Sequence, residues 1–412
     1  MHWQPALPEI YRSLPPSELA ARISDRRQRL GDRLVILGHH YQTDAVIRHA
    51  DLTGDSLKLS QLAAGVADEK PVEHVVFCGV HFMAETADLL TPEHVQIHLP
   101  DLSAGCSMAD MADFDDATHA WDVMHEALGK LGWSGRIVPV TYVNSTAAIK
   151  AFVGEHGGAC CTSSNADQVF AWALAGGTEP AAPGEDIKLL FLPDQHLGRN
   201  TAAAYGVDVH AAAPVYDPKL QRRGEPLGGM TPDQLLDARV ILWAGHCSVH
   251  KLFRPEHCDA IRAENDALPA GAEPTRILVH PECAKEVVDR SDLNGSTEFI
   301  IRTISDAEPG TKWAIGTEHN LVNRLANAAK DRGVDVRILS DCQCMCTTMY
   351  RIDEPHLLWT LDGLCGIGGD SGTTEGLPVE ARNVIRVHPE VRGPALAAVN
   401  RMLALSGAPA ID

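Results

Sequence analysis

The 412-residue sequence lacks the features that direct a chain to nucleic acid or to a membrane. Only 35 Lys and Arg stand against 55 Asp and Glu, and the formal charge of −20 argues against nucleic acid or an anionic membrane as the main partner. No apolar run approaches the roughly 20 residues of a membrane span. The first residues, "MHWQPALPEIYRS", show no basic-then-apolar signal pattern. We therefore expect a cytoplasmic protein with no nucleic-acid or membrane partner.

The sequence also lacks the CxxC pairs of local zinc fingers, although it contains 11 cysteines. In a reducing compartment, cysteines are more often buried, metal-binding or catalytic than disulfide-bonded. Three of them, Cys106, Cys247 and Cys346, lie at or just beyond the ends of predicted strands. Soft thiolates of this kind suit zinc or an iron–sulfur cluster. The remaining ones outside 341–346 are interpreted as buried small apolar residues, namely Cys78, Cys160, Cys161, Cys258, Cys283 and Cys365.

Cysteines alternate in "DCQCMC", residues 341–346. The pattern leaves three interpretations open: a redox pair, part of a metal site, or one ligand with two bystanders. In an extended backbone Cys342, Cys344 and Cys346 face one way. Two further thiols are therefore expected beside any ligand in this segment, and a redox role for Cys342 and Cys344 remains an alternative to inert packing.

Short apolar runs alternate with helical patterns along the chain, which indicates parallel α/β units. Strands are predicted within 33–42, 74–81, 95–106, 136–145, 187–198, 240–250, 275–283, 312–320 and 335–344. Helices are predicted at 55–67, 166–177 and 318–333. Residues 209–238 are rich in Pro and Gly and predict an insertion, whereas 379–405 predict a closing strand and a helix. Because ligands gather at the carboxyl ends of parallel strands, we expect the functional site there.

Two strand ends carry alternating groups that can transfer protons. His39 and Tyr41 alternate in "GHHYQ", and His280 and Glu282 alternate in "HPEC", so each pair points one way in an extended backbone. A single such His is usually structural, but the repetition favours acid–base chemistry. Ser, Thr and Asn occupy probable strand–helix junctions at 54–60, 141–145, 160–166 and 294–299. These residues either cap the helices or help the free N–H groups there to bind carboxylate or phosphate. The residues alone thus predict an α/β enzyme with a metal or cluster and a small anionic substrate.

An ordered set of motifs from residue 38 to 352 closely resembles the quinolinate synthase family. It consists of "GHHYQ", "GDSLKLS", "VVFCGVHFMAET", "AGCSMADM", "TYVNST", "CCTSSNA", "FLPDQHLG", "WAGHCSVH", "VHPEC", "GST" and "CTTMYRI". The resemblance implies three pseudo-repeated three-layer α/β/α domains with parallel sheets around a central active site. The expected domains are 1–108 completed by 347–412, then 109–247 with an insertion near 209–238, and then 248–346.

The resemblance further implies an enzyme with a [4Fe–4S] cluster held by Cys106, Cys247 and Cys346. One iron without a protein ligand then serves as a Lewis acid. The implied reaction, a step of NAD biosynthesis from aspartate, condenses iminoaspartate with dihydroxyacetone phosphate to give quinolinate, phosphate and water. The segment after Cys346 departs from the family pattern, so Cys344 and Cys342 are alternative ligands.

The resemblance also carries substrate contacts to particular positions. They are His39, Ser56, Tyr142, Val143, Asn144, Ser163, His280, Pro281, Glu282 and Thr297. We expect Glu282 and His280 to move protons with the help of Tyr41 and His39, while the hydroxyl and amide groups hold carboxylates and phosphate. A transient partnership with an L-aspartate oxidase that supplies the imine is a further expectation. Two alternatives are a cluster-dependent hydro-lyase of a small hydroxy acid and a zinc-stabilised anion-binding protein.

Overall fold

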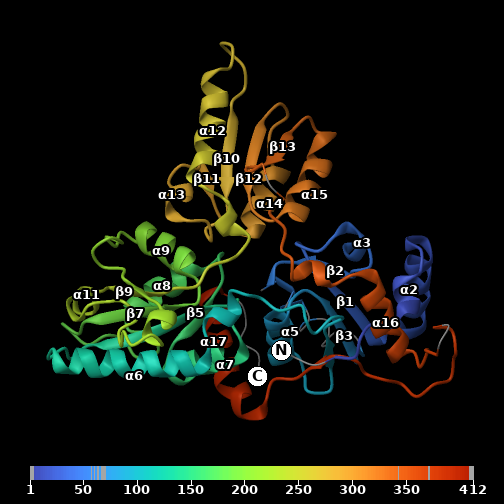
Figure 1. Cartoon of the computed structure of the whole chain (residues 1–412), viewed down its shortest axis with the longest axis horizontal. Coiled ribbons are helices and arrows are strands. Elements are labelled where there is room, and N and C mark those ends of the chain that lie inside the picture. The colour runs from blue at the N-terminus through green and yellow to red at the C-terminus, as the bar shows by residue number, and fades with distance from the viewer. Residues whose placement is uncertain are drawn as a thin grey trace. The chain divides into compact units, whose positions relative to one another are not determined.

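The chain divides into two compact units, which are seen in a computed structural model (Figure 1). The structure describes residues 4–56, 58–59, 61–62, 65, 71–341, 343–369 and 372–407. Unit 1 consists of Met1–Cys106, His319–Leu321 and Met345–His388. Unit 2 consists of Ser107–Glu318, Val322–Cys344 and Pro389–Asp412.

Unit 1 is built on one five-stranded sheet, in the order β14-β4-β3-β1-β2. Its strands are β1 (Leu34–His39), β2 (Leu52–Gly54), β3 (His74–Cys78), β4 (Gln96–His98) and β14 (Val384–Ile385). Neighbouring strands are parallel except for β14, which runs antiparallel to β4. All six residues of β1 are buried, as expected for a strand of a parallel sheet that is covered on both faces.

The helices of unit 1 include two that meet a buried carboxylate. They are α1 (Glu9–Arg12), α2 (Pro16–Leu30), α3 (Asp44–Ile47), α5 (His81–Leu90) and α16 (Glu354–Leu364), with short 3-10 turns at η1 (Gly31–Arg33) and η4 (Met349–Arg351). Asp362 of α16 accepts hydrogen bonds from the Tyr11 hydroxyl at 2.9 Å and from Nε of Arg26 at 2.7 Å. This network fixes α16 against α1 and α2, although α16 is more than 300 residues away in sequence.

The first sheet of unit 2 has the order β6-β5-β7-β9-β8 and all its strands are parallel. The strands are β5 (Arg136–Tyr142), β6 (Ala159–Cys161), β7 (Ile187–Leu192), β8 (Val215–Tyr216) and β9 (Val240–Trp243). The associated helices are η2 (Ala109–Met111), α6 (Phe114–Lys130), α7 (Ala147–Glu155), α8 (Ala166–Leu174), α9 (Gln195–Ala204), α10 (Pro218–Gln221), α11 (Pro232–Asp237) and α17 (Pro389–Leu405). The predicted insertion at 209–238 contributes β8 to this sheet, where Tyr216 stacks on Trp243 at 5.3 Å between ring centroids.

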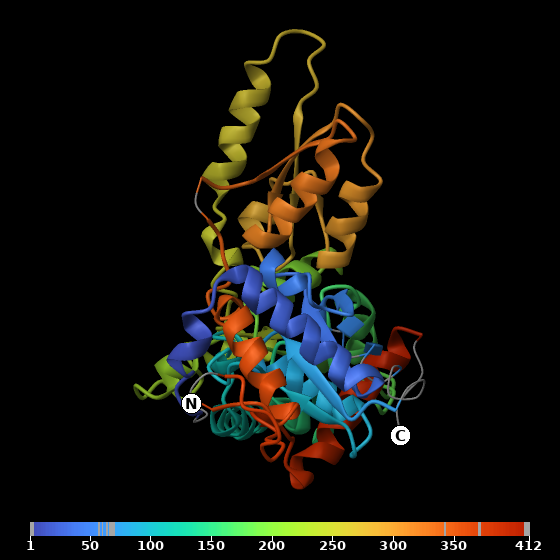
Figure 2. The same cartoon turned by 90° about the vertical axis from the view of Figure 1, so that its right-hand side faces the viewer.

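The second sheet of unit 2 has four parallel strands in the order β11-β10-β12-β13. They are β10 (Thr275–Val279), β11 (Leu293–Asn294), β12 (Lys312–Gly316) and β13 (Asp335–Ile338). Its helices are η3 (His250–Leu252), α12 (Pro255–Asp266), α13 (Lys285–Val288), α14 (Thr297–Ser305) and α15 (His319–Lys330). Helix α12 packs along β10, and Figure 2 shows the two side by side up to the loop that joins them.

The predicted α/β fold class is confirmed, because the described residues form three sheets, parallel except for β14, together with the helices of each unit. Each predicted strand run contains an observed strand, and 379–405 contains β14 and α17 as expected. The predicted helix at 55–67 includes residues that lie outside the described part of the chain. The boundaries of the three expected domains stay a prediction. Helix α17, which follows β14 in the chain, packs on α7 and β6 within unit 2.

Candidate active site

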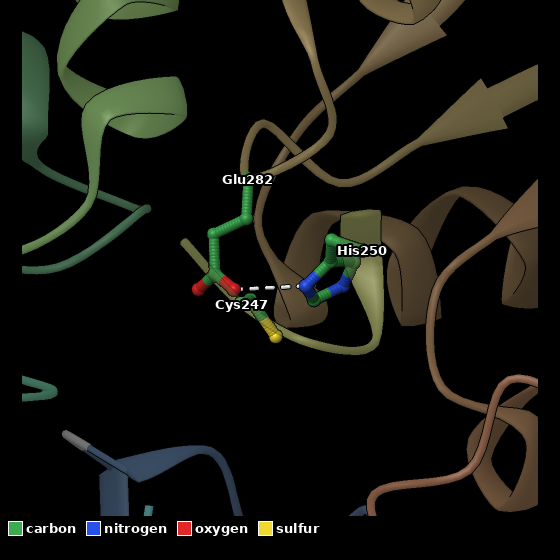
Figure 3. A group of neighbouring side chains, drawn as sticks. All are labelled: Cys247, His250 and Glu282. Atoms are coloured by element: carbon green, nitrogen blue, oxygen red, sulfur yellow. Dashed lines mark hydrogen bonds and ion pairs between the residues drawn. The ribbon is translucent and has the colours of Figure 1, made fainter. Parts of the chain in front are cut away.

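A buried acid–base pair lies beyond the carboxyl end of β10. Oε2 of Glu282 is 2.8 Å from Nδ1 of His250, the first residue of η3, and both side chains are almost fully buried (Figure 3). The other ring nitrogen of His250, Nε2, lies 3.1 Å from the hydroxyl of Thr317. The His250 ring also stacks on that of His280, with 4.5 Å between centroids. These contacts hold the His250 ring from both nitrogens and one face.

Cys247 brings a thiol to the same place. It follows β9 by four residues and is half-buried, and Figure 3 shows its sulfur beside the Glu282–His250 pair. One ligand atom each from Cys247, His250 and Glu282 lie within 4.8 Å of one another. Gly245 lets the loop that leads to Cys247 pass close to the loop after β7, because a Cβ there would lie 2.1 Å from the carbonyl oxygen of Pro193. The three side chains form a group that can hold a metal ion.

The surroundings keep the carboxylate of Glu282 ionised. Burial raises its pKa, but the charge and hydrogen bond of His250 outweigh burial, with His280 and the Tyr142 hydroxyl adding to the effect, so the pKa lies below its ordinary value. For His280 the dominant cause is burial, which together with the neighbouring His250 lowers its pKa to about 3. His280 is therefore a neutral imidazole at neutral pH, placed beside a carboxylate that can accept a proton.

A second buried carboxyl group, Asp194, lies close to Glu282. Its Oδ1 caps α9 by accepting hydrogen bonds from the backbone N–H groups of His196 at 2.6 Å and Leu197 at 3.1 Å. Burial and the negative charge of Glu282 raise the pKa of Asp194 well above its ordinary value. Two carboxyl groups in one environment thus have pKa values shifted in opposite directions, as is frequent in sites that transfer protons.

The turn that carries His280 and Glu282 is held by a side chain from α9. The amide nitrogen of Asn200 donates to the carbonyl oxygens of Pro281 at 2.8 Å and Cys283 at 2.9 Å. Pro281 itself is buried. Because the turn lies between these two contacts, Asn200 fixes the direction in which Glu282 leaves the backbone.

The two predicted acid–base patterns have the same backbone construction. In unit 1 the N–H of Tyr41 donates to Nδ1 of His39 at 3.1 Å, and in unit 2 the N–H of Glu282 donates to Nδ1 of His280 at 3.3 Å. After each turn an aspartate reaches back to the preceding strand: Asp51 accepts from the N–H of Ile36 and Asp292 from that of Ile277. The residues that make these contacts in unit 1 have the same spacing along the chain as their counterparts in unit 2. The repetition predicted for the domains therefore extends to the geometry of these turns.

The predicted anion-binding residues of unit 2 lie near helix starts. Ser163 and Pro281 line a cavity of about 740 Å³, together with Ser296, the N-cap of α14, and with Lys285 and Arg302. Thr297, the first residue of α14, is buried. Asp167, Asp289 and Glu298 also line this cavity, so its charge is mixed and the helix N-termini are its main anion-attracting feature.

Tyr142, Val143 and Asn144 form a tight turn between β5 and α7. The hydroxyl of Ser145 donates to the carbonyl oxygen of Tyr142 at 2.9 Å, and the fully buried ammonium of Lys150 donates to the carbonyl oxygen of Ser145. Val143 is buried and Asn144 half-buried. The turn is thus fixed by side chains that follow it in the chain.

The predicted ligands Cys106 and Cys346 lie in unit 1, and both are half-buried. Nη1 of Arg351 donates to the hydroxyl of Ser103 at 3.1 Å, which joins the loop before Cys106 to the 3-10 turn η4 after Cys346. Sγ of Cys346 lies 3.4 Å from the Thr348 hydroxyl. Ser56, two residues after the end of β2, is half-buried.

The other cysteines differ from these three. Cys344 is fully buried, with Sγ 3.1 Å from the hydroxyl of Ser340 in unit 2, and Cys342 lies outside the described residues. The interpretation as buried residues is confirmed for Cys78, Cys160, Cys161, Cys258 and Cys283, each with a pKa raised by burial. It is wrong for Cys365, which is half-buried because it sits at the C-terminal end of α16.

Four residues of this site were not predicted from the sequence: His250, Asp194, Asn200 and Thr317. Only His250 has a local signal, because "CSVH" places a histidine three residues after Cys247, a spacing that metal sites use. The others look like ordinary helix or loop residues until the strands are brought together.

The comparisons with known proteins agree over nearly the whole chain. A family model described as "Quinolinate synthetase A protein" matches residues 21–404. Three curated relatives, each named quinolinate synthase, are similar to the chain. The protein of Halalkalibacterium halodurans is 48% identical over 398 residues, 96% of each chain. That of Nocardioides sp. is 50% identical over 400 residues, 96% of this chain and 92% of its own. That of Acidobacterium capsulatum is 47% identical over 397 residues, 96% of this chain and 95% of its own.

Among the described helices, none is long and apolar enough to span a bilayer.

Proposed function

The chain belongs to the quinolinate synthetase A protein family, and on this premise we propose that it condenses iminoaspartate with dihydroxyacetone phosphate. The products are quinolinate, phosphate and water, in a step of NAD biosynthesis from aspartate. The observation that carries the proposal is the buried Glu282–His250 pair beside the thiol of Cys247. It combines a base, a neutral histidine nearby and a metal-binding group, which such a condensation requires.

Cys106, Cys247 and Cys346 would hold a [4Fe–4S] cluster. Their thiols suit it, because all three are half-buried and therefore accessible, whereas Cys78, Cys160 and others are sealed in the core. When bound, a cluster with one iron that lacks a protein ligand supplies a Lewis acid for substrate oxygen or nitrogen.

Glu282 acts as the base in this proposal. Its lowered pKa keeps it ionised near neutral pH, so it can take a proton from a substrate carbon or nitrogen as the new bonds form. His280, neutral because of its burial, can take up a proton released during the reaction or donate a hydrogen bond to a departing hydroxyl group. Tyr41 and His39, held in the same local geometry, assist with protons elsewhere in the reaction.

The substrates carry carboxylates and a phosphate, and the hydroxyl and amide groups would bind them. Ser163 lies three residues before α8 and Thr297 is the first residue of α14, and free backbone N–H groups at helix starts favour anions. Ser56, Tyr142 and Asn144 complete this set, with Val143 and Pro281 contributing backbone. The proposal also includes a cytoplasmic location. It further includes a transient contact with an L-aspartate oxidase, because the imine hydrolyses in water and is best passed on directly.

A two-substrate assay tests the proposal. Anaerobic protein incubated with iminoaspartate and dihydroxyacetone phosphate is expected to form quinolinate, detected by mass spectrometry, and neither substrate alone suffices. A hydro-lyase would instead dehydrate one hydroxy acid without the triose phosphate. A zinc-stabilised anion-binding protein would bind the substrates and return them unchanged.

A further inference from the structure

We propose that Cys247, His250 and Glu282 form a second metal site, which binds one zinc ion when the chain lacks its iron–sulfur cluster. The zinc site itself stands on the geometry of unit 2, and only its competition with the cluster rests on the proposed function.

The three ligand atoms are already close to the required spacing. Together they lie within 4.8 Å of one another, and the His250 and Glu282 atoms are 2.8 Å apart. In tetrahedral zinc sites, with Zn–S of about 2.3 Å and Zn–N of about 2.0 Å, neighbouring ligand atoms are roughly 3.5 Å apart. Side-chain rotations that move the ligand atoms by about an ångström therefore suffice to close the site around an ion.

The histidine has its metal-binding nitrogen directed correctly. Nε2 of His250 lies 3.1 Å from the Thr317 hydroxyl, which can accept its proton, while Nδ1 faces Glu282. In the zinc-bound state the ring keeps its proton on Nε2, where Thr317 accepts it, and the Nδ1 lone pair binds the ion, which is the arrangement that outer partners of zinc-bound histidines produce. Zinc replaces the proton between Nδ1 and Glu282, and that proton leaves to solvent together with the proton of the Cys247 thiol.

The charges also match. A thiolate and a carboxylate neutralise a divalent ion, and the soft sulfur and the imidazole favour zinc over magnesium or calcium. Three protein ligands leave the fourth position for water. Oδ2 of the buried Asp194, which makes no hydrogen bond among the described residues, is a polar group near Glu282 available to that water.

The consequence is a competition at one thiol. Cys247 cannot supply its sulfur to zinc in this group and also complete a three-cysteine cluster. Zinc-loaded chains are therefore expected to resist cluster assembly until the zinc is removed by a chelator.

Single substitutions in the full-length chain separate the two sites. Cluster-free protein is titrated with zinc under anaerobic conditions, and bound zinc, iron and sulfide are measured after reconstitution. His250→Ala should weaken zinc binding by more than about 100-fold, since losing a ligand exceeds the effect of losing an outer partner, yet should still acquire iron. Cys106→Ser should lose the cluster and keep zinc, and Cys247→Ser should lose both. Cobalt(II) in place of zinc should show thiolate charge-transfer absorption that disappears in Cys247→Ser.

The rival arrangement is zinc held by the three cluster cysteines. It predicts that Cys106→Ser loses zinc and that His250→Ala retains it, and either result overturns the proposal. Circular dichroism of each apo variant checks that it folds, and Thr317→Val, which removes only the outer partner, gives an intermediate loss of about 10-fold. Failure of the chain to take up iron would contradict the proposed function but leave the zinc result independent.

Discussion

Nδ1 of His250 lies 2.8 Å from Oε2 of Glu282, and the pair is buried. Removing either partner would leave a buried polar group without its partner, which is costly. The pair also explains why Glu282 has a lowered pKa in spite of its burial. This contact joins the loop after β9 to the turn after β10, so it couples the position of Cys247 to that of Glu282.

Replacing Glu282 with Gln should suppress turnover while the cluster is retained. The amide keeps the shape and a hydrogen bond to His250 but cannot accept a proton, and loss of a general base typically costs about 10²–10⁴-fold. Quinolinate formation is measured alongside iron content. Turnover equal to that of the wild type would refute the assignment of Glu282 as the base.

Replacing Asn200 with Ala should reduce kcat by about 10-fold, because the turn with His280 and Glu282 loses its two side-chain hydrogen bonds and small misplacements are expensive. The matched control is Asn265→Ala. Asn265 holds both backbone groups of Thr275 at the opposite end of β10, at 2.8 Å each. Both variants should be somewhat less stable to urea, but only Asn200→Ala should turn over slowly; equal rates for the two would show that the turn is rigid without Asn200.

The folded state should become less stable as the pH is lowered, because the buried His98 resists protonation. Its burial, with smaller effects of His74 and Arg386, lowers its pKa to about 4. The folded state therefore prefers the neutral ring: the stabilisation is complete above the unfolded pKa of about 6.5 and is lost as the pH falls toward 4. The full loss is about 3 kcal/mol.

The variant His98→Asn tests this, because asparagine can still donate to the carbonyl oxygen of Arg382, which is 2.9 Å from Nδ1 of His98. Urea unfolding is compared at pH 7.5 and pH 4.5. The free-energy difference between the wild type and the variant should shrink at the lower pH, whereas a constant difference would exclude His98 as the titrating group.

Serine substitutions should identify the ligand in the segment 341–346. Cys346→Ser is expected to abolish iron binding, because Cys346 is half-buried and accessible. Cys344→Ser should retain iron, since Cys344 is fully buried beside Ser340. Cys342→Ser should also retain it. Iron loss in Cys344→Ser with retention in Cys346→Ser would move the ligand.

The sequence was sufficient to predict the strand runs, because parallel strands covered on both faces leave continuous apolar segments such as that of β1. It could not predict the short edge strand β8. β8 has two residues, and its pairing with β9 depends on where the 209–238 segment folds back, which local propensity does not encode.

The site residues, like the strands, were predicted only where a local sequence pattern marks them. His39, Tyr41, His280 and Glu282 are recognisable because each pair alternates at a strand end. His250 and Asp194 were missed, because their role comes from the meeting of three loops that are distant in sequence. Asn200 is likewise an ordinary helix residue until its contacts with Pro281 and Cys283 are seen.

The most direct test of the central proposal is anaerobic purification of the full chain, followed by iron and sulfide analysis and the two-substrate assay on one sample. The account predicts about four iron and four sulfide per chain and quinolinate formation that disappears when the cluster is removed. A colourless, iron-free protein with undiminished quinolinate formation would contradict it.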